Sequence, residues 1–325
     1  MNNYLNNERN YFGNEIPGMI EPIEQSMLQE LASNLDFKGN ETAVEFGAFF
    51  GRSTACISSG LLSNDNFKSN GRFFVYDSFE CHIDGAFYPH VLSHAKSKNV
   101  DGLLEIRNSK VDFFPVFQHY LRDYINSGFL FPEKAELKNS FPNGDVINLM
   151  HIDSPKFYKD FKFIFYRFFP LLREGSLIIF QDFFYHWSAS LIAVCGLMLK
   201  TGYLCIESSA ASSLVCRVLK PFDLEKISEF DLIMESKGAI PLLIDVACEM
   251  TSDLKLDRSE IFAPRLILAK VQWMFENGEH INAADEISSF ITKRARFNMS
   301  LGFDFLELMR YGFSLERLYD QDHSD

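Results

Sequence analysis

The stretch Val44-Glu45-Phe46-Gly47-Ala48-Phe49-Phe50-Gly51-Arg52-Ser53-Thr54 decides the fold. It predicts a buried strand that runs into a glycine turn, followed by a helix capped by Ser53 or Thr54. Gly47 and Gly51 lack side chains, which suits a turn whose backbone approaches a ligand closely. A strand, a glycine turn and a helix in this order are typical of sites for nucleotide-like cofactors. The alternative is a glycine turn that packs the helix and binds no ligand.

The acid within this stretch indicates which cofactor would bind. Glu45 would repel the pyrophosphate of a dinucleotide, whereas it would attract a cofactor that carries an ammonium and a sulfonium group. The spacing also departs from G-x-G-x-x-G, and the phosphate loop G-x-x-x-x-G-K-[ST] is absent from the sequence. S-adenosylmethionine therefore fits this stretch better than NAD or ATP.

Composition and charge limit the classes of partner. The chain has 325 residues and a formal net charge of −13, which argues against nucleic acid as the main partner. Its six cysteines form no C-x-x-C pair, so we expect reduced, mostly buried thiols in preference to disulfides or a zinc site. The polar, Asn-rich segment 1–14 is not typical of a signal peptide, and no apolar run is long enough to span a bilayer. We therefore expect a cytoplasmic protein without membrane contact.

Strand and helix signals alternate after a helical lead-in at 19–35. Strands are expected at 43–47, 73–76, 103–106, 146–152 and 176–180, and helices at 53–62, 111–125, 157–172 and 188–199. Arg173-Glu174-Gly175 is expected to form a turn, and segments 203–207 and 214–219 a hairpin. This alternation predicts an α/β fold, a doubly wound and mostly parallel seven-stranded sheet of the Rossmann-like kind, with the hairpin as an antiparallel edge.

The expected strand ends carry polar side chains. They are Glu45, Asp77, Asn108 with Ser109, Asp153 and Asp182. Because ligands bind at the carboxyl ends of the strands in such sheets, this edge is the expected site.

The pattern becomes purely helical after Pro221. Helices are expected at 240–251, 263–277, 283–296 and 303–311, with Asn277-Gly278 as the turn of an antiparallel pair. A basic cluster of Lys293, Arg294 and Arg296 is interpreted as a solvated helix face. We expect a lead-in over 1–38, a cofactor-binding domain over 39–220 and a helical appendage over 221–325. The appendage could form a homo-oligomer or cover the acceptor site.

Four sequence pieces together resemble a known family. They are Val44–Gly47 with Gly51–Thr54, then Val75-Tyr76-Asp77-Ser78-Phe79-Glu80, then His151-Ile152-Asp153, and finally Pro170–Asp182. In this order the chain resembles class I S-adenosylmethionine-dependent methyltransferases. More narrowly, it is similar to the small-molecule O-methyltransferases grouped with macrocin and cephalosporin-type enzymes. The resemblance covers residues 40–220 and leaves the helical tail uncovered.

The resemblance implies a set of cofactor-binding residues. They are Glu45, Gly47, Gly51, Ser53, Asp77, Asn108, Ser109 and Asp153. The first three would line the methionine end of the cofactor, and Asn108 and Ser109 would lie near adenine. Asp77 would accept hydrogen bonds from both ribose hydroxyls, since a carboxylate can bind a vicinal diol. Alternatively, Asp77 is a turn residue before Ser78.

The resemblance also implies a catalytic set of Asp153, Asp182 and His186. Asp153 and Asp182 match positions where related enzymes often hold a divalent cation such as Mg²⁺. Here Ser154-Pro155-Lys156 and Gln181 depart from the family pattern. A metal ligand has therefore been lost or replaced, Lys156 is a candidate for the cation's place, and metal dependence stays open.

A base is needed if the acceptor is a hydroxyl, and His186 is the candidate because imidazole titrates near neutral pH. His151 is ranked lower, since adjacent side chains of a strand face opposite sides. Tyr185 and Trp187 are expected in the core or at the wall of an acceptor pocket.

The function implied is methyl transfer to a small molecule, such as the hydroxyl of a sugar or natural product. The alternatives are a scaffold protein of the same fold without turnover, and an NAD-type oxidoreductase.

Overall fold

The computed structural model describes residues 15–38, 40–67, 71–143, 146–254 and 259–293. It divides into two compact units. The first unit contains the described residues up to Pro155 together with Phe163–Ile179, and the second contains Lys156–Lys162 and the described residues from Phe180 onward. The three-part organisation expected from the sequence, with boundaries at 38 and 220, stays a prediction.

The main sheet has seven strands in the order β6-β2-β1-β7-β8-β10-β9. These are β1 (Thr42–Phe46), β2 (Arg72–Asp77), β6 (Leu130–Lys134), β7 (Ile147–Ile152), β8 (Leu172–Phe180), β9 (Leu204–Ala210) and β10 (Ser213–Val218). β1 is parallel to β2 and β7, β2 is parallel to β6, and β9 and β10 form an antiparallel hairpin. Every residue of β1 and β7 is buried, as expected of central parallel strands. The predicted mostly parallel seven-stranded sheet is confirmed.

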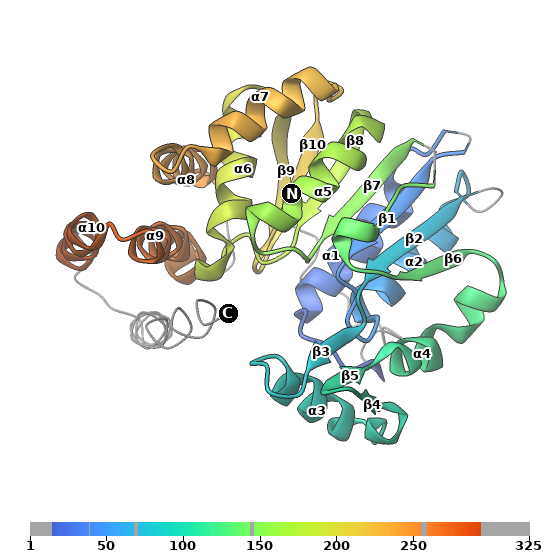
Figure 1. Cartoon of the computed structure of the whole chain (residues 1–325). Coiled ribbons are helices and arrows are strands. Elements are labelled where there is room, and N and C mark those ends of the chain that lie inside the picture. Colours follow the sequence, from blue (N-terminus) through green and yellow to red (C-terminus); the bar gives the residue numbers. More distant parts are fainter. Residues whose placement is uncertain (1–14, 39, 68–70, 144–145, 255–258, 294–325) are drawn as a thin grey trace. The chain divides into compact units, whose positions relative to one another are not determined.

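The helices of the first unit follow the sequence pattern closely. They are α1 (Pro22–Asn34), α2 (Arg52–Ser63), α3 (Tyr88–Ser97) and α4 (Phe114–Asn126). α1 and α2 pack against each other (Figure 1). Gly60 permits this contact, because a Cβ on it would lie 2.3 Å from the carbonyl oxygen of Gln29.

The third strand of the main sheet was predicted wrongly. Segment 103–106 contributes instead to a separate three-stranded sheet, β3-β5-β4, made of β3 (Glu80–His82), β4 (Glu105–Arg107) and β5 (Lys110–Asp112). The strand beside β2 is β6, which the sequence analysis missed. β6 contains Pro132, and it is an edge strand, the position where a sheet tolerates proline.

Aromatic side chains fill the core of the first unit. Phe46 and Tyr76 stack with ring centroids 5.4 Å apart, and Phe168 lies edge-on to them at 4.7 and 5.2 Å. Each such pair contributes about 0.5–1.5 kcal/mol beyond its buried area. The aromatic helix expected over 157–172 is shorter, as α5 (Tyr158–Arg167) ends before a 3₁₀ turn at Phe169–Leu171.

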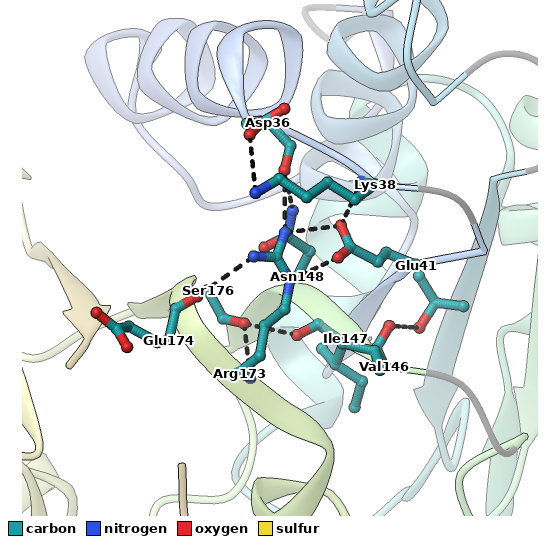
Figure 2. A network of polar contacts seen from close by, with 10 residues as sticks. Asp36, Lys38, Glu41, Val146, Ile147, Asn148, Arg173, Glu174 and Ser176 are labelled. Atoms are coloured by element: carbon teal, nitrogen blue, oxygen red, sulfur yellow. Dashed lines mark hydrogen bonds and ion pairs between the residues drawn. The ribbon is translucent and has the colours of Figure 1, made fainter. Parts of the chain in front are cut away.

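The turn predicted at Arg173-Glu174-Gly175 was also wrong, because these residues lie within β8. Arg173 is instead the centre of a polar network (Figure 2). Its Nε lies 2.5 Å from Oε1 of Glu41, and its Nη2 donates to Oε2 of Glu41 at 2.9 Å and to the carbonyl of Asp36 at 3.1 Å. Arg173 therefore fastens the segment that leads into β1 to the beginning of β8.

The helices of the second unit are α6 (Ala189–Lys200), α7 (Leu224–Glu235), α8 (Ala239–Thr251), α9 (Ser259–Glu276) and α10 (His280–Lys293). α6 packs on α8, and α9 contacts both α8 and α10. A Cβ on Gly196 would lie 2.3 Å from the carbonyl oxygen of Leu243, so this glycine lets α6 and α8 approach. The helices expected at 240–251 and 263–277 are confirmed, whereas α7 was not predicted.

Three predictions lie outside what the structure describes: segment 1–14, the helix at 303–311, and the side chains of Lys293, Arg294 and Arg296. Among the helices that the structure describes, none combines the length and apolar composition needed to cross a membrane.

Candidate functional site

The turn after β1 depends on two glycines in the left-handed region. Gly47 has φ +85° and Gly51 has φ +95°. A Cβ on Gly47 would lie 2.8 Å from both the Cβ and the backbone nitrogen of Ser154, and a Cβ on Gly51 would lie 2.6 Å from Leu121. The close approaches that these glycines permit are therefore to the protein's own chain. Their predicted contact with a ligand stays a prediction.

Asp77 braces this turn from the end of β2. Its Oδ2 accepts hydrogen bonds from the backbone N–H groups of Ala48 at 2.7 Å and Phe49 at 3.0 Å, and its Oδ1 accepts one from Phe79 at 2.7 Å. Burial raises the pKa of Asp77, the three N–H groups oppose that rise, and the charge of Asp153 adds to it. A carboxylate offers about four acceptor sites. Binding both ribose hydroxyls, as predicted, would therefore require one of the backbone bonds to yield.

Glu45 lies beneath the turn with a fully buried side chain. Its Oε2 accepts a hydrogen bond from the hydroxyl of Thr54 at 2.5 Å, and its Oε1 lies 3.0 Å from Nδ1 of His151. Both Glu45 and His151 have side chains that are 0% exposed. The carboxylate therefore already has two buried partners. That it lines the methionine end of the cofactor stays a prediction.

The predicted cap of α2 was wrong for the same reason. The N-cap residue is Gly51, which has no side chain, and the Thr54 hydroxyl bonds to Glu45 instead of to the helix backbone. Ser53 does lie in the first turn of α2, as expected, and is buried. The alternation argument against His151 does not hold, since it lies two residues before Asp153. Burial in the pair with Glu45 distinguishes His151 instead.

Asp153 follows β7 and lies beside the glycine turn. The backbone N–H groups of Asp153 and Ser154 both donate to the carbonyl oxygen of Phe46 at 2.9 Å. This arrangement brings Asp153 to the same edge of the first unit as Gly47 and Asp77. Two acids and a glycine turn therefore meet at the carboxyl ends of β1, β2 and β7, as the strand-end pattern predicted.

Asn108 and Ser109 lie elsewhere in the first unit. They have φ +49° and +62° and form the two-residue turn between β4 and β5, which requires positive φ at both positions. Both residues are exposed. The prediction that they follow a strand of the main sheet was wrong, and with it the reason for placing adenine beside them is lost.

Asp182 follows β8 and belongs to a polar cluster within the second unit. The ammonium of Lys156 donates to Oδ2 of Asp182 at 2.8 Å, and the hydroxyl of Ser212 donates to Oδ1 at 3.3 Å. Neighbouring Ser213 donates to the side-chain oxygen of Gln181 at 2.8 Å. Asp182 has φ +58°, an uncommon backbone conformation for a residue other than glycine. The segment after β8 is thereby joined to the turn of the β9–β10 hairpin.

His186 lies in a 3₁₀ turn just before α6. Its side chain is only 2% exposed, and its ring lies 4.8 Å from that of Trp187. Trp187 stacks on Tyr185 at 4.3 Å, and the guanidinium of Arg265 from α9 lies 4.3 Å above the Tyr185 ring. The helical tail therefore packs on the segment that carries the predicted base. The role of His186 as that base stays a prediction.

The residues present do not fit a divalent cation. Within the described residues, no group of three or more His, Cys, Asp and Glu side chains could hold a metal ion. The carboxylate of Asp182, one of the two predicted ligands, is paired with Lys156. The prediction of a possible Mg²⁺ site at Asp153 and Asp182 therefore gains no support.

Sequence reasoning missed Ser212, Arg265 and the strand β6. Ser212 and Arg265 approach Asp182 and Tyr185 only through the tertiary fold, so no local pattern marks them. β6 did leave a signal, the short apolar run Phe129-Leu130-Phe131 after Gly128. It ends at the edge that carries Asp77, where the N–H of Ala135 donates to the Asp77 carbonyl at 2.9 Å.

Comparison with known proteins adds a family match. Residues 44–183 match a family model described as a methyltransferase domain. No curated protein matches the sequence.

Among solved structures, the chain is similar to the O-methyltransferase NovP, at 14% identity and a TM-score of 0.44, over 63% of this chain and 83% of that one. It is also similar to CalS11, a TDP-rhamnose 3′-O-methyltransferase of calicheamicin biosynthesis, at 12% identity and a TM-score of 0.37, over 60% and 77%. A third similar structure is the S-adenosylhomocysteine-bound methyltransferase PaMTH1 of Podospora anserina, at 11% identity and a TM-score of 0.38, over 62% and 80%.

The family match and the seven-stranded, mostly parallel sheet identify a class I methyltransferase domain over residues 44–183. The protein is an S-adenosylmethionine-dependent methyltransferase.

Proposed function

We propose that this enzyme transfers the methyl group of S-adenosylmethionine to a hydroxyl of a small molecule, such as a sugar or a natural product. The observation that carries the proposal is the edge of the first unit where Asp77 holds the turn at Ala48 and Phe49 beside Asp153. The donor set suits the cofactor, because a carboxylate can accept hydrogen bonds from ribose hydroxyls. The resemblance to small-molecule O-methyltransferases supports a hydroxyl acceptor.

In the proposed reaction the acceptor oxygen attacks the methyl carbon in line with the C–S bond. A C–O bond forms, the C–S bond breaks with its electron pair remaining on sulfur, and S-adenosylhomocysteine leaves. The hydroxyl proton passes to a base, for which Asp153, Asp182 and His186 are the candidates. The protein aligns the two substrates and assists the loss of the proton.

Ligand binding tests the cofactor half of the proposal. Thermal shift and calorimetry with S-adenosylmethionine, S-adenosylhomocysteine and NAD should show binding of the first two alone. Stabilisation by NAD without a response to S-adenosylmethionine would overturn it and favour an oxidoreductase.

Turnover tests the acceptor half. A panel of sugars, phenols and amines should yield S-adenosylhomocysteine with a hydroxyl-bearing compound and not with amines. Tight binding of the cofactor with no product from any member of the panel would favour a scaffold protein of the same fold.

A further inference from the structure

We infer that Lys156 takes the place of a divalent cation in the acceptor site, so that the enzyme works without a metal ion. This inference rests on the proposed function, because it concerns how the same site receives the acceptor oxygen. It commits the site to acceptors with an anionic or strongly polar oxygen. The argument uses residues of the second unit only.

The first step is the position of the ammonium. Nζ of Lys156 lies 2.8 Å from Oδ2 of Asp182, and both side chains are partly exposed, at 27% and 22%. Asp182 directly follows β8, at the edge of the sheet where ligands of such folds bind. The pair is therefore within reach of a bound molecule.

The second step is how firmly the pair is held. Oδ1 of Asp182 accepts a hydrogen bond from the Ser212 hydroxyl at 3.3 Å, and the backbone N–H of Phe184 donates to the Ser212 carbonyl at 3.1 Å. Ser213 adds its bond to Gln181 at 2.8 Å. The hairpin turn thus fixes the carboxylate from the side opposite to its contact with Lys156, and the carboxylate in turn fixes the ammonium.

The third step is electrostatic. A divalent cation bound to Asp182 would lie a few ångströms from the Lys156 ammonium, and the repulsion between them would oppose binding. An ammonium is a compact positive charge with three donors, so it can hold a carboxylate and an acceptor oxygen together. It therefore supplies what a cation would supply here, attraction for an oxygen that is losing its proton.

The test measures metal binding directly, in the full chain, with Mn²⁺ alone as the probe and electron paramagnetic resonance as the readout. Lys156→Gln should bind Mn²⁺ at least about tenfold more tightly than the wild type, because it removes a nearby positive charge. Lys156→Arg keeps the charge and should bind like the wild type. Adding Asp182→Asn to Lys156→Gln should abolish the gain, which locates the ion at Asp182.

Two results would overturn the inference. One is a Mn²⁺ ion bound tightly by the wild type and lost in Asp182→Asn. The other is equal Mn²⁺ affinity in the wild type and Lys156→Gln, with circular dichroism showing that both are folded.

Turnover provides a second readout once the acceptor panel yields a substrate. Excess EDTA should leave the formation of S-adenosylhomocysteine unchanged, whereas a loss that Mg²⁺ restores would contradict the inference. Failure of the proposed function would appear separately, as absence of S-adenosylmethionine binding in calorimetry with no change in the Mn²⁺ results.

Discussion

Replacement of Asp77 by alanine should damage both the glycine turn and the binding of S-adenosylmethionine. The substitution deprives the backbone N–H groups of Ala48, Phe49 and Phe79 of their shared acceptor. A hydrogen bond to a charged group contributes about 1.5–3 kcal/mol, but water can enter at this half-buried edge and replace part of it. At roughly 1 kcal/mol for each N–H group, Asp77→Ala should lower the free energy of unfolding by about 3 kcal/mol.

The effect on the cofactor should be at least as large. Loss of one charge-assisted bond to ribose costs about 1.5–3 kcal/mol, and the loosened turn adds to that cost. We therefore expect the Kd for S-adenosylmethionine to rise by about 100-fold or more, since 1.4 kcal/mol corresponds to a factor of ten. Calorimetry measures the affinity, and urea unfolding measures the stability.

Asp77→Asn separates the two roles of this side chain. Its remaining carbonyl oxygen can accept from Ala48 and Phe49, while its amide group opposes the N–H of Phe79. Asn should therefore recover part of the stability and less of the affinity. An unchanged affinity for S-adenosylmethionine in folded Asp77→Ala would refute the assignment of the cofactor to this edge.

Two further predictions concern stability. Arg173→Ala leaves the buried carboxylate of Glu41 without its partner and should lower the free energy of unfolding by about 2 kcal/mol, with Arg173→Lys in between; a urea midpoint equal to that of the wild type would contradict this. Burial and the charge of Glu45 raise the pKa of Cys56 to about 12, so its thiol should resist iodoacetamide in the native state, as followed by mass spectrometry. Because the unfolded thiol ionises near about 8.5, this group should lower stability as the pH rises from there toward the pKa of the folded state.

The sequence predicts an element well where a long segment repeats one pattern. Segments 43–47, 146–152 and 240–251 are continuous or periodic apolar runs, and each becomes a strand or helix within one or two residues of its expected ends. Segments 103–106 and 130–134 are both short and apolar, and only pairing with β2 decides between them. Pro132 marked the second as a break, although an edge strand accepts it.

The same distinction applies to the site. Asp77, Asp153 and Asp182 were placed correctly at strand ends, because that placement follows from the order of strands along the chain. The partners of side chains did not follow, since Thr54 meets Glu45 across nine residues of sequence and Arg173 meets Glu41 across 132. Partners at such separations depend on the folded sheet.

Gly47 offers the sharpest test of whether the turn serves the protein's packing or leaves room for a ligand. Gly47→Ala places a Cβ 2.8 Å from the backbone of Ser154 at φ +85°, where an L-residue costs about 1–2 kcal/mol before any clash. Because Ser154 must move, Asp153 moves with it, and both stability and affinity for S-adenosylmethionine should fall. Gly102→Ala is the matched control, since nothing lies within 4 Å of its Cβ. Should Gly47→Ala keep its unfolding midpoint and lose only cofactor affinity, the turn would be spaced for the ligand and not for Ser154.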